Sequence, residues 1–158
     1  MKKIFIVTVV LALALVPLAI GAQTPAEFQY LSFDIGYAPG WDFGNSSQIT
    51  PSLFGINVRI SDKLSAGIQT LQDATTDNFL LLKYSFLSQV RATVGFGVQD
   101  TGGANDAASS LGFEVIPFSR SVGGLAATEF KVAVKYDSPF ANMVNGKILF
   151  ALAFGIGF

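Results

Sequence analysis

The stretch KILFALAFGIGF, residues 147–158, decides the fold that we expect for this chain. Large apolar side chains occupy every second position of it: Ile148, Phe150, Leu152, Phe154, Ile156 and Phe158. Between them stand Lys147, Leu149 and four alanine or glycine residues. Successive side chains of a β-strand point to opposite faces, so the stretch predicts a strand with one bulky apolar face and one mostly small face.

The same alternation recurs in seven segments upstream. These predicted strands span residues 31–37, 54–60, 64–70, 80–86, 90–99, 110–115 and 129–136. Turn-forming residues fill the connections, at residues 39–47, 61–63, 72–77, 87–89, 100–106, 117–124 and 138–146. Eight strands joined in order by short connections predict an all-β fold, an antiparallel up-and-down β-barrel.

The distribution of charge indicates which face of this barrel points outward. Only 13% of the residues are charged, too few to cover eight strands in water, whereas a barrel with a lipid-facing exterior needs this pattern. Closure also leaves no unpaired strand edge in hydrocarbon. We therefore expect a transmembrane barrel, whose eight strands leave an interior that side chains fill.

Charged residues fall on the small face of the predicted strands, which would line the lumen. The expected lumenal charge cluster comprises Asp34, Arg59, Lys83, Arg91, Glu114, Glu129, Lys131 and Lys135, with Lys147 and Asp137 on the same inward face. We expect ion pairs among them, with Arg91 beside Glu114, and a structural role. The alternative is a constriction for ions.

The first three odd-numbered connections hold five acidic residues and no basic one: Asp42, Asp73, Asp77, Asp100 and Asp106. A barrel entered from the periplasm places these connections outside the cell. Amphipathic rings near strand ends predict interface anchors, at Tyr30, Tyr37, Trp41, Tyr84, Phe86 and Tyr136.

The N-terminus has the pattern of a secretory signal peptide. Lys2 and Lys3 precede an apolar run that ends at Pro17, and small residues lead to Ala22. We expect cleavage after Ala22, which leaves residues 23–158 as the barrel; the alternative is a retained anchor helix. The mature chain would have a net charge of −3, which argues against a nucleic-acid partner.

Two absences restrict the chemistry that the chain can perform. The sequence contains no cysteine and no histidine, so thiol catalysis, cysteine-ligated metals and Ser-His triads are excluded. We expect no catalytic residue, no metal site, no cofactor and no enzymatic activity.

The C-terminal run resembles the strand that the outer-membrane assembly machinery recognises in Gram-negative barrels. The strand count and short turns resemble the small OmpA-, OmpX- and OmpW-type barrels, and the charged interior is more similar to the OmpA and OmpX type. The resemblance implies the outer membrane of a diderm bacterium, periplasmic chaperones during export, and an assembly signal in Phe154, Ile156 and Phe158.

These observations favour a monomeric, non-enzymatic outer-membrane protein in contact with membrane lipid. Its roles would be envelope integrity or surface interaction through short extracellular loops. The alternative is a narrow channel for small solutes or, as in OmpW-type barrels, small hydrophobic molecules.

Overall fold

The computed structural model describes residues 30–100, 104–122 and 126–158, so the predicted signal peptide, residues 1–22, lies outside the described residues. The elements are β1 (Leu31–Tyr37), β2 (Gly40–Asp42), β3 (Ser47–Ile49), β4 (Ser52–Arg59), β5 (Leu64–Gln72), β6 (Thr76–Leu87), β7 (Val90–Asp100), β8 (Asn105–Val122), β9 (Ala126–Pro139), η1 (Met143–Asn145) and β10 (Lys147–Gly157). In these ranges no helix is long and apolar enough to span a membrane.

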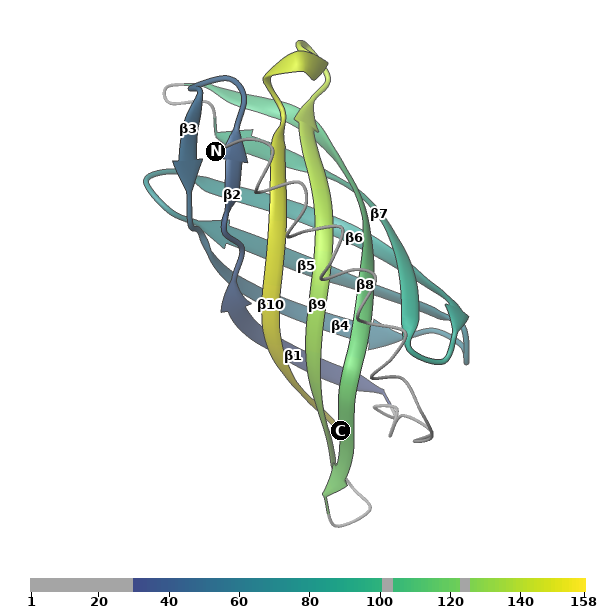
Figure 1. Cartoon of the computed structure of the whole chain (residues 1–158). Coiled ribbons are helices and arrows are strands. Elements are labelled where there is room, and N and C mark those ends of the chain that lie inside the picture. The colour runs from purple at the N-terminus through teal and green to yellow at the C-terminus, as the bar shows by residue number, and fades with distance from the viewer. Residues whose placement is uncertain (1–29, 101–103, 123–125) are drawn as a thin grey trace.

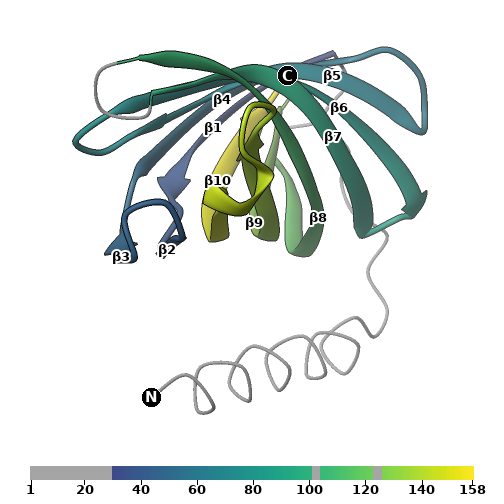
Figure 2. The ribbon, with the colours of Figure 1, turned by 90° about the horizontal axis from the view of Figure 1, so that it is seen from above.

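Antiparallel pairing between neighbouring strands closes the sheet into a barrel (Figures 1 and 2). β10 pairs with β9 on one side and with β1 on the other, where Ser32 lies opposite Gly157 and Tyr37 opposite Leu152. The predicted all-β, eight-stranded antiparallel barrel is therefore confirmed. We call the end that carries Phe158 the C-terminal end and the end that carries η1 the loop end.

Two of the eight wall strands are interrupted by proline. β1 and β2 lie against β10 in one continuous register, with Ala38 and Pro39 between them, and β3 and β4 are separated by Thr50 and Pro51. Proline has no N–H to give to the ladder, but its carbonyl still accepts: Phe150 N donates to Pro39 O at 2.8 Å, and Ala38 N donates to Pro51 O at 2.9 Å. The predicted connection 39–47 is thus too long, because only residues 43–46 form the turn.

The predicted connection 117–124 is wrong, because β8 continues through it to Val122. The register with β9 shifts between Val115 and Phe118, which marks a β-bulge at Ile116 and Pro117. The turn residues there change the register and leave the strand intact. The β8–β9 hairpin consequently extends past the C-terminal end of its neighbours (Figure 1).

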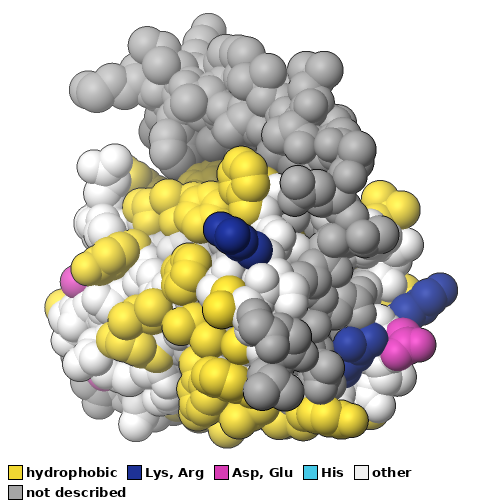
Figure 3. All heavy atoms as spheres, turned by 90° about the horizontal axis from the view of Figure 1, so that it is seen from below, with side chains coloured by type: hydrophobic (Ala, Val, Ile, Leu, Met, Phe, Trp, Pro, Cys, Tyr) yellow, Lys and Arg dark blue, Asp and Glu magenta, His cyan; other side chains and the backbone are white. Residues whose placement is uncertain are grey.

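Burial alternates along the strands, and large apolar side chains lie on the outside. In the described residues, 31 large hydrophobic side chains are exposed, whereas 20 polar or charged residues are buried. Hydrophobic side chains also occupy much of the surface seen from the C-terminal end (Figure 3). Eleven of the buried residues carry a formal charge, so the barrel is apolar outside and ionic inside.

Candidate functional site

The interior holds a network of six buried charges, which we call the central charge network: Asp34, Lys83, Arg91, Glu114, Glu129 and Lys131. Arg91 on β7 lies directly opposite Glu114 on β8. Its Nη1 lies 3.2 Å from Glu114 Oε1, and its Nη2 lies 3.3 Å from Glu129 Oε1 on β9. One guanidinium therefore bridges the carboxylates of two adjacent strands, which suits its planar fork of donors.

Two lysines connect these carboxylates to Asp34 on β1. Lys83 Nζ lies 3.1 Å from Glu114 Oε2 and 3.8 Å from Asp34 Oδ2. Lys131 Nζ lies 2.7 Å from Asp34 Oδ1 and 3.1 Å from Glu129 Oε2. The six side chains thus form a closed ring of alternating charge that spans the barrel interior and joins strands far apart in the sequence.

The ring contains three cations and three anions, so it is neutral as a unit. Burying a charge is costly unless partners compensate it, and each member of the ring has at least two oppositely charged neighbours. Asn57 also donates to Asp34 Oδ2 at 3.0 Å. A Cβ added to Gly155 would lie only 2.7 Å from Asp34 Oδ1, so the small wall residue leaves room for this carboxylate.

An apolar layer lies next to the ring toward the loop end. Its large members are Leu53, Leu71, Phe79, Leu81 and Leu149, packed with small residues Ala38, Ala108, Ala133, Ala151 and Ala153. Along β6 the inward side chains follow the order Asp77, Phe79, Leu81 and Lys83. The interior is therefore divided along its axis into an ionic, an apolar and a second ionic layer.

The sequence analysis missed three of the five large members of this layer because it made three strands too short. Leu53, Leu71 and Phe79 each lie one position outside a predicted strand. All three are in phase with the inward residues of their own strands, and all three are buried. Extending the alternation past the predicted ends would have found them.

The outer ionic layer, at the loop end, contains two further lysines. Lys147 Nζ lies 2.7 Å from Asp77 Oδ2, and Lys135 Nζ lies 3.4 Å from Asp137 Oδ2. Lys135 also donates to Gln69 Oε1 and sits 5.2 Å from the centroid of the Phe79 ring. Each of the two buried lysines therefore has a carboxylate partner.

The sequence analysis wrongly assigned two of the acidic residues of this end to exterior loops. Asp77 is 4% exposed and faces Lys147 inside the barrel. Asp42 is also buried, and its Oδ1 accepts from the backbone N of Gly44 at 2.8 Å and of Asn45 at 3.1 Å. Asp42 therefore holds the β2–β3 turn, a common role for aspartate beside a turn.

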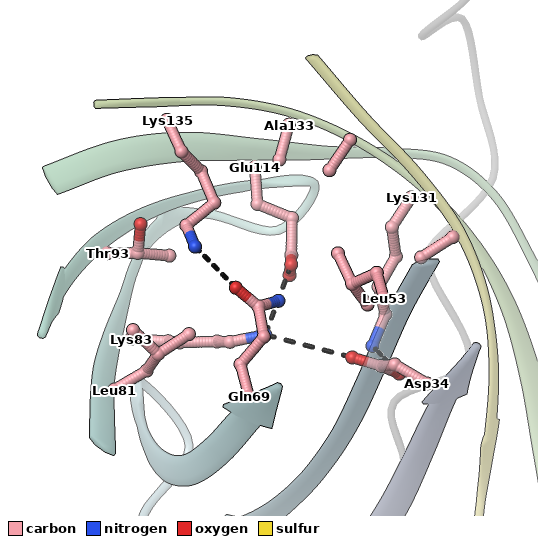
Figure 4. A pocket seen from close by; sticks show the side chains of 12 residues that line it. Asp34, Leu53, Gln69, Leu81, Lys83, Thr93, Glu114, Lys131, Ala133 and Lys135 are labelled. Carbon is pink, nitrogen blue, oxygen red and sulfur yellow. Dashed lines mark hydrogen bonds and ion pairs between the residues drawn. The ribbon is translucent and has the colours of Figure 1, made fainter. Parts of the chain in front are cut away.

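Figure 4 shows the side chains of Lys135, Gln69, Lys83, Glu114, Asp34 and Lys131 pointing toward one another inside the barrel. The cavity bounded by Asp34, Gln69, Lys83, Thr93, Glu114 and Lys131 measures about 20 Å³. A buried water needs at least about 10 to 15 Å³ on this measure, so the space holds about one water molecule and excludes larger solutes.

Arg59 lies apart from the other seven predicted members of the lumenal cluster. Its side chain is 23% exposed at the C-terminal end, and its Nη2 lies 3.0 Å from Asp62 Oδ1. The other seven, Asp34, Lys83, Arg91, Glu114, Glu129, Lys131 and Lys135, are buried. Six of these form the ring, and Lys135 belongs to the outer ionic layer.

The predicted anchor and assembly residues lie on the outer face. Exposed fractions range from 37% for Tyr136 to 73% for Tyr30, with Tyr37, Tyr84 and Phe86 between them, and Trp41 is half-buried. Phe154, Ile156 and Phe158 are exposed along β10. Phe158 also completes the seam, since its N donates to Leu31 O at 2.8 Å and its O accepts from Tyr30 N at 2.8 Å.

The geometry is that of a closed antiparallel barrel of eight strands with a filled, ion-paired interior and an apolar exterior. No protein-family model matches the chain, and no curated protein shows significant similarity to it.

Proposed function

We propose that the chain is a small outer-membrane β-barrel protein of a diderm bacterium, of the OmpA or OmpX type, with a closed lumen and no enzymatic activity. Its outer face contacts lipid, and its contribution is to envelope integrity or to surface contacts made by the loops. It is exported with a signal peptide and acts as a monomer.

The observation that carries this proposal is the distribution of side chains, which is the inverse of that in a soluble protein: apolar side chains lie outside and charged ones inside. In the described residues, 31 large hydrophobic side chains are exposed, while buried hydrophobic residues number 13, six of them alanine. Monomeric soluble proteins rarely expose contiguous apolar patches beyond a few hundred Å², because such surface associates in water. Hydrocarbon is the solvent that fits an apolar exterior around ion pairs.

The height of the apolar band is consistent with a membrane. Outward residues of β10 run without a charge from Ile148 to Phe158. At about 3.3 Å per residue and a strand tilt of about 40°, that distance corresponds to about 25 Å along the barrel axis. The apolar band of outer-membrane barrels is about 25 Å tall.

The layered interior argues against the alternative of a channel. A solute would have to pass the apolar layer around Phe79 and separate the neutral ion pairs around Glu114. The cavity beside these ion pairs measures about 20 Å³, which is room for about one water molecule. The absence of histidine from the whole sequence supports a non-enzymatic role, because the common serine and cysteine nucleophiles need such a base.

The proposed partners follow from the closing strand. Phe154, Ile156 and Phe158 form an alternating row of exposed apolar side chains on β10. The outer-membrane assembly machinery would recognise this row, after periplasmic chaperones have kept the mature chain unfolded. Membrane lipid is the permanent partner of the outer face.

A single charged substitution distinguishes a lipid-facing exterior from a water-facing one. Leu82 is exposed in the middle of the outward face of β6. In lipid vesicles, Leu82→Arg should destabilise the barrel by about 2 to 4 kcal/mol, because arginine near the bilayer midplane is costly. Ala74→Arg, in the exposed β5–β6 turn, is the matched control and should have little effect.

The measurement is the urea midpoint of unfolding from vesicles, together with fractionation of cells that make the wild-type chain. Recovery in outer membranes and a selective effect of Leu82→Arg support the proposal. A soluble wild-type protein, or a Leu82→Arg variant as stable as Ala74→Arg, would rule it out.

A further inference from the structure

The outer face carries a groove beside the seam where β1 closes onto β10. It measures about 460 Å³ and crosses four neighbouring strands, β10, β1, β4 and β5 (Figure 1). Sites for small ligands measure about 300 to 1,000 Å³, so the groove has the volume of a ligand site. The single charged residue in its lining is Asp34, whose carboxylate points inward to Lys131.

The strand register gives the groove its direction. One wall follows Phe33, which lies opposite Ile156 on β10 and opposite Ile56 on β4. The second wall follows Ile35, two residues further along β1, and Asp34 turns inward between the two walls. The groove therefore runs across the strands, and three strand spacings of about 4.8 Å give it a length of about 14 Å.

The groove is apolar along most of its length and polar at one end. On β10 its walls are Phe154 and Ile156, whereas Thr70 lines it on β5. Thr70 Oγ1 donates to Oδ1 of Asn78, its partner on β6, at 2.8 Å. Asn78 is exposed, and its amide carries two N–H donors. This combination suits an amphiphile with an apolar chain and a hydrogen-bond acceptor at one end.

The polar end is also the end of the groove nearer the loop end of the barrel. Thr70 is the third residue from the loop-end terminus of β5, whereas Ile156 is the second residue from the opposite terminus of β10. The groove therefore rises from the seam toward the loop end, as the tilt of barrel strands requires. A membrane lipid has the same arrangement, with its polar region at the interface and its chain in the hydrocarbon.

We propose that this groove binds one acyl chain of a phospholipid, with the ester carbonyl at Thr70 and Asn78 and the chain directed toward the β1–β10 seam. The ester carbonyl accepts from the Asn78 amide, and the chain lies between the two apolar walls. A hydrogen bond at one end and two walls distinguish this chain from the lipid that contacts the rest of the exterior. The inference rests on the proposed membrane location.

The test uses the mature chain refolded in an amine-oxide detergent and titrated with dioleoylphosphatidylcholine, and native mass spectrometry counts the lipids bound to each barrel. The ether-linked analogue, which lacks the ester carbonyls, is titrated in parallel. Ile56→Trp fills the groove, and Asn78→Leu removes the amide donors. Val94→Trp is the matched control, because Val94 is an exposed outward residue of β7 that does not line the groove.

We expect saturable binding of a single ester-linked lipid, with an affinity that Ile56→Trp lowers by about tenfold or more and that Val94→Trp leaves unchanged. The ether-linked lipid should bind the wild-type barrel about tenfold more weakly, as for loss of one hydrogen bond. Asn78→Leu should remove the difference between the two lipids, because it removes the donor that distinguishes them.

Ile68→Trp fills the same groove from β5, so it decides the question if Ile56→Trp does not fold. Unsaturable binding, equal effects of Ile56→Trp and Val94→Trp, or equal affinity of the wild-type barrel for the two lipids would overturn the inference. The urea midpoint of Leu82→Arg tests the membrane location independently, so failure of the groove and failure of the proposed function are distinguishable.

Discussion

Arg91 and Glu114 stand directly opposite each other on β7 and β8, with Arg91 Nη1 3.2 Å from Glu114 Oε1. Glu114 also holds Lys83 at 3.1 Å, so Glu114→Ala leaves two buried cations under-compensated. We expect it to lower the free energy of unfolding by about 3 to 5 kcal/mol, measured by urea titration of the refolded barrel. Asp62→Asn, which breaks an exposed ion pair with Arg59, should have a much smaller effect.

A double-mutant cycle with Arg91→Ala and Glu114→Ala isolates their direct interaction. Because the two side chains share a network, the double variant should lose less stability than the sum of the single ones. Strictly additive losses would show that the pair is not coupled.

Phe79→Ala tests the apolar layer as the barrier to conduction. Phe79 is 1% exposed, so its truncation leaves a cavity between the two ionic layers and should cost about 3 to 5 kcal/mol. In planar bilayers the wild-type protein should give at most small, infrequent conductance events, and Phe79→Ala should raise their frequency. Phe96→Ala, which truncates an outward ring, should not. Steady, porin-like conductance from a wild-type monomer would contradict the filled interior.

Trp41 reports the depth of the loop end, because it is the single tryptophan of the chain. It lies on β2 opposite Ile148, the second residue of β10. In vesicles, lipids brominated near the headgroup should quench its fluorescence more strongly than lipids brominated near the chain terminus, as expected for an indole at the interface. Leu82→Trp in a Trp41→Phe background supplies the deep reference. Stronger quenching of Trp41 by lipids brominated near the chain terminus would contradict an interfacial position of the loop end.

Variants of Phe158 distinguish its role in closing the barrel from its proposed role in recognition by the assembly machinery. Deleting it removes the ring and the backbone hydrogen bonds to Tyr30 and Leu31, so folded yield should fall both in detergent and in cells. Phe158→Ala keeps the backbone bonds, and it should refold in detergent yet reach the outer membrane poorly. Phe118→Ala, an exposed ring at the same end, is the control. Unchanged heat-modifiable migration and membrane yield after deletion would contradict a role for this residue.

The alternation of β10 and of the upstream segments was enough to predict the barrel and the inward direction of its charges. A period of two is a local property, and the inward position of Lys83 or Lys131 follows from its neighbours in the sequence. Strand ends were harder to predict. Turn-forming residues such as Pro117 terminate a strand in most contexts, but here a bulge absorbs Pro117 and pairing with β9 continues.

The partners inside the lumen could be predicted only where the strands are adjacent. Arg91 and Glu114 are on neighbouring strands, so a hairpin register brings them together. The contact of Lys131 with Asp34 joins residues 97 positions apart and depends on the closure of β1 onto β10. The inward location of Asp77 depends on how far β6 extends, which the turn-like residues around it obscured.

The inward charges also make the strands that carry them specific for one alignment. A slip of one residue along β9 would turn Lys131 and Lys135 to the outside and bring Val132 and Val134 inside. It would break the contacts of Lys131 with Asp34 and of Lys135 with Gln69 at the same time. The leucine, valine and phenylalanine side chains of the exterior would fit almost any alignment of the strands. The buried polar and charged side chains of the interior therefore select the correct strand pairing.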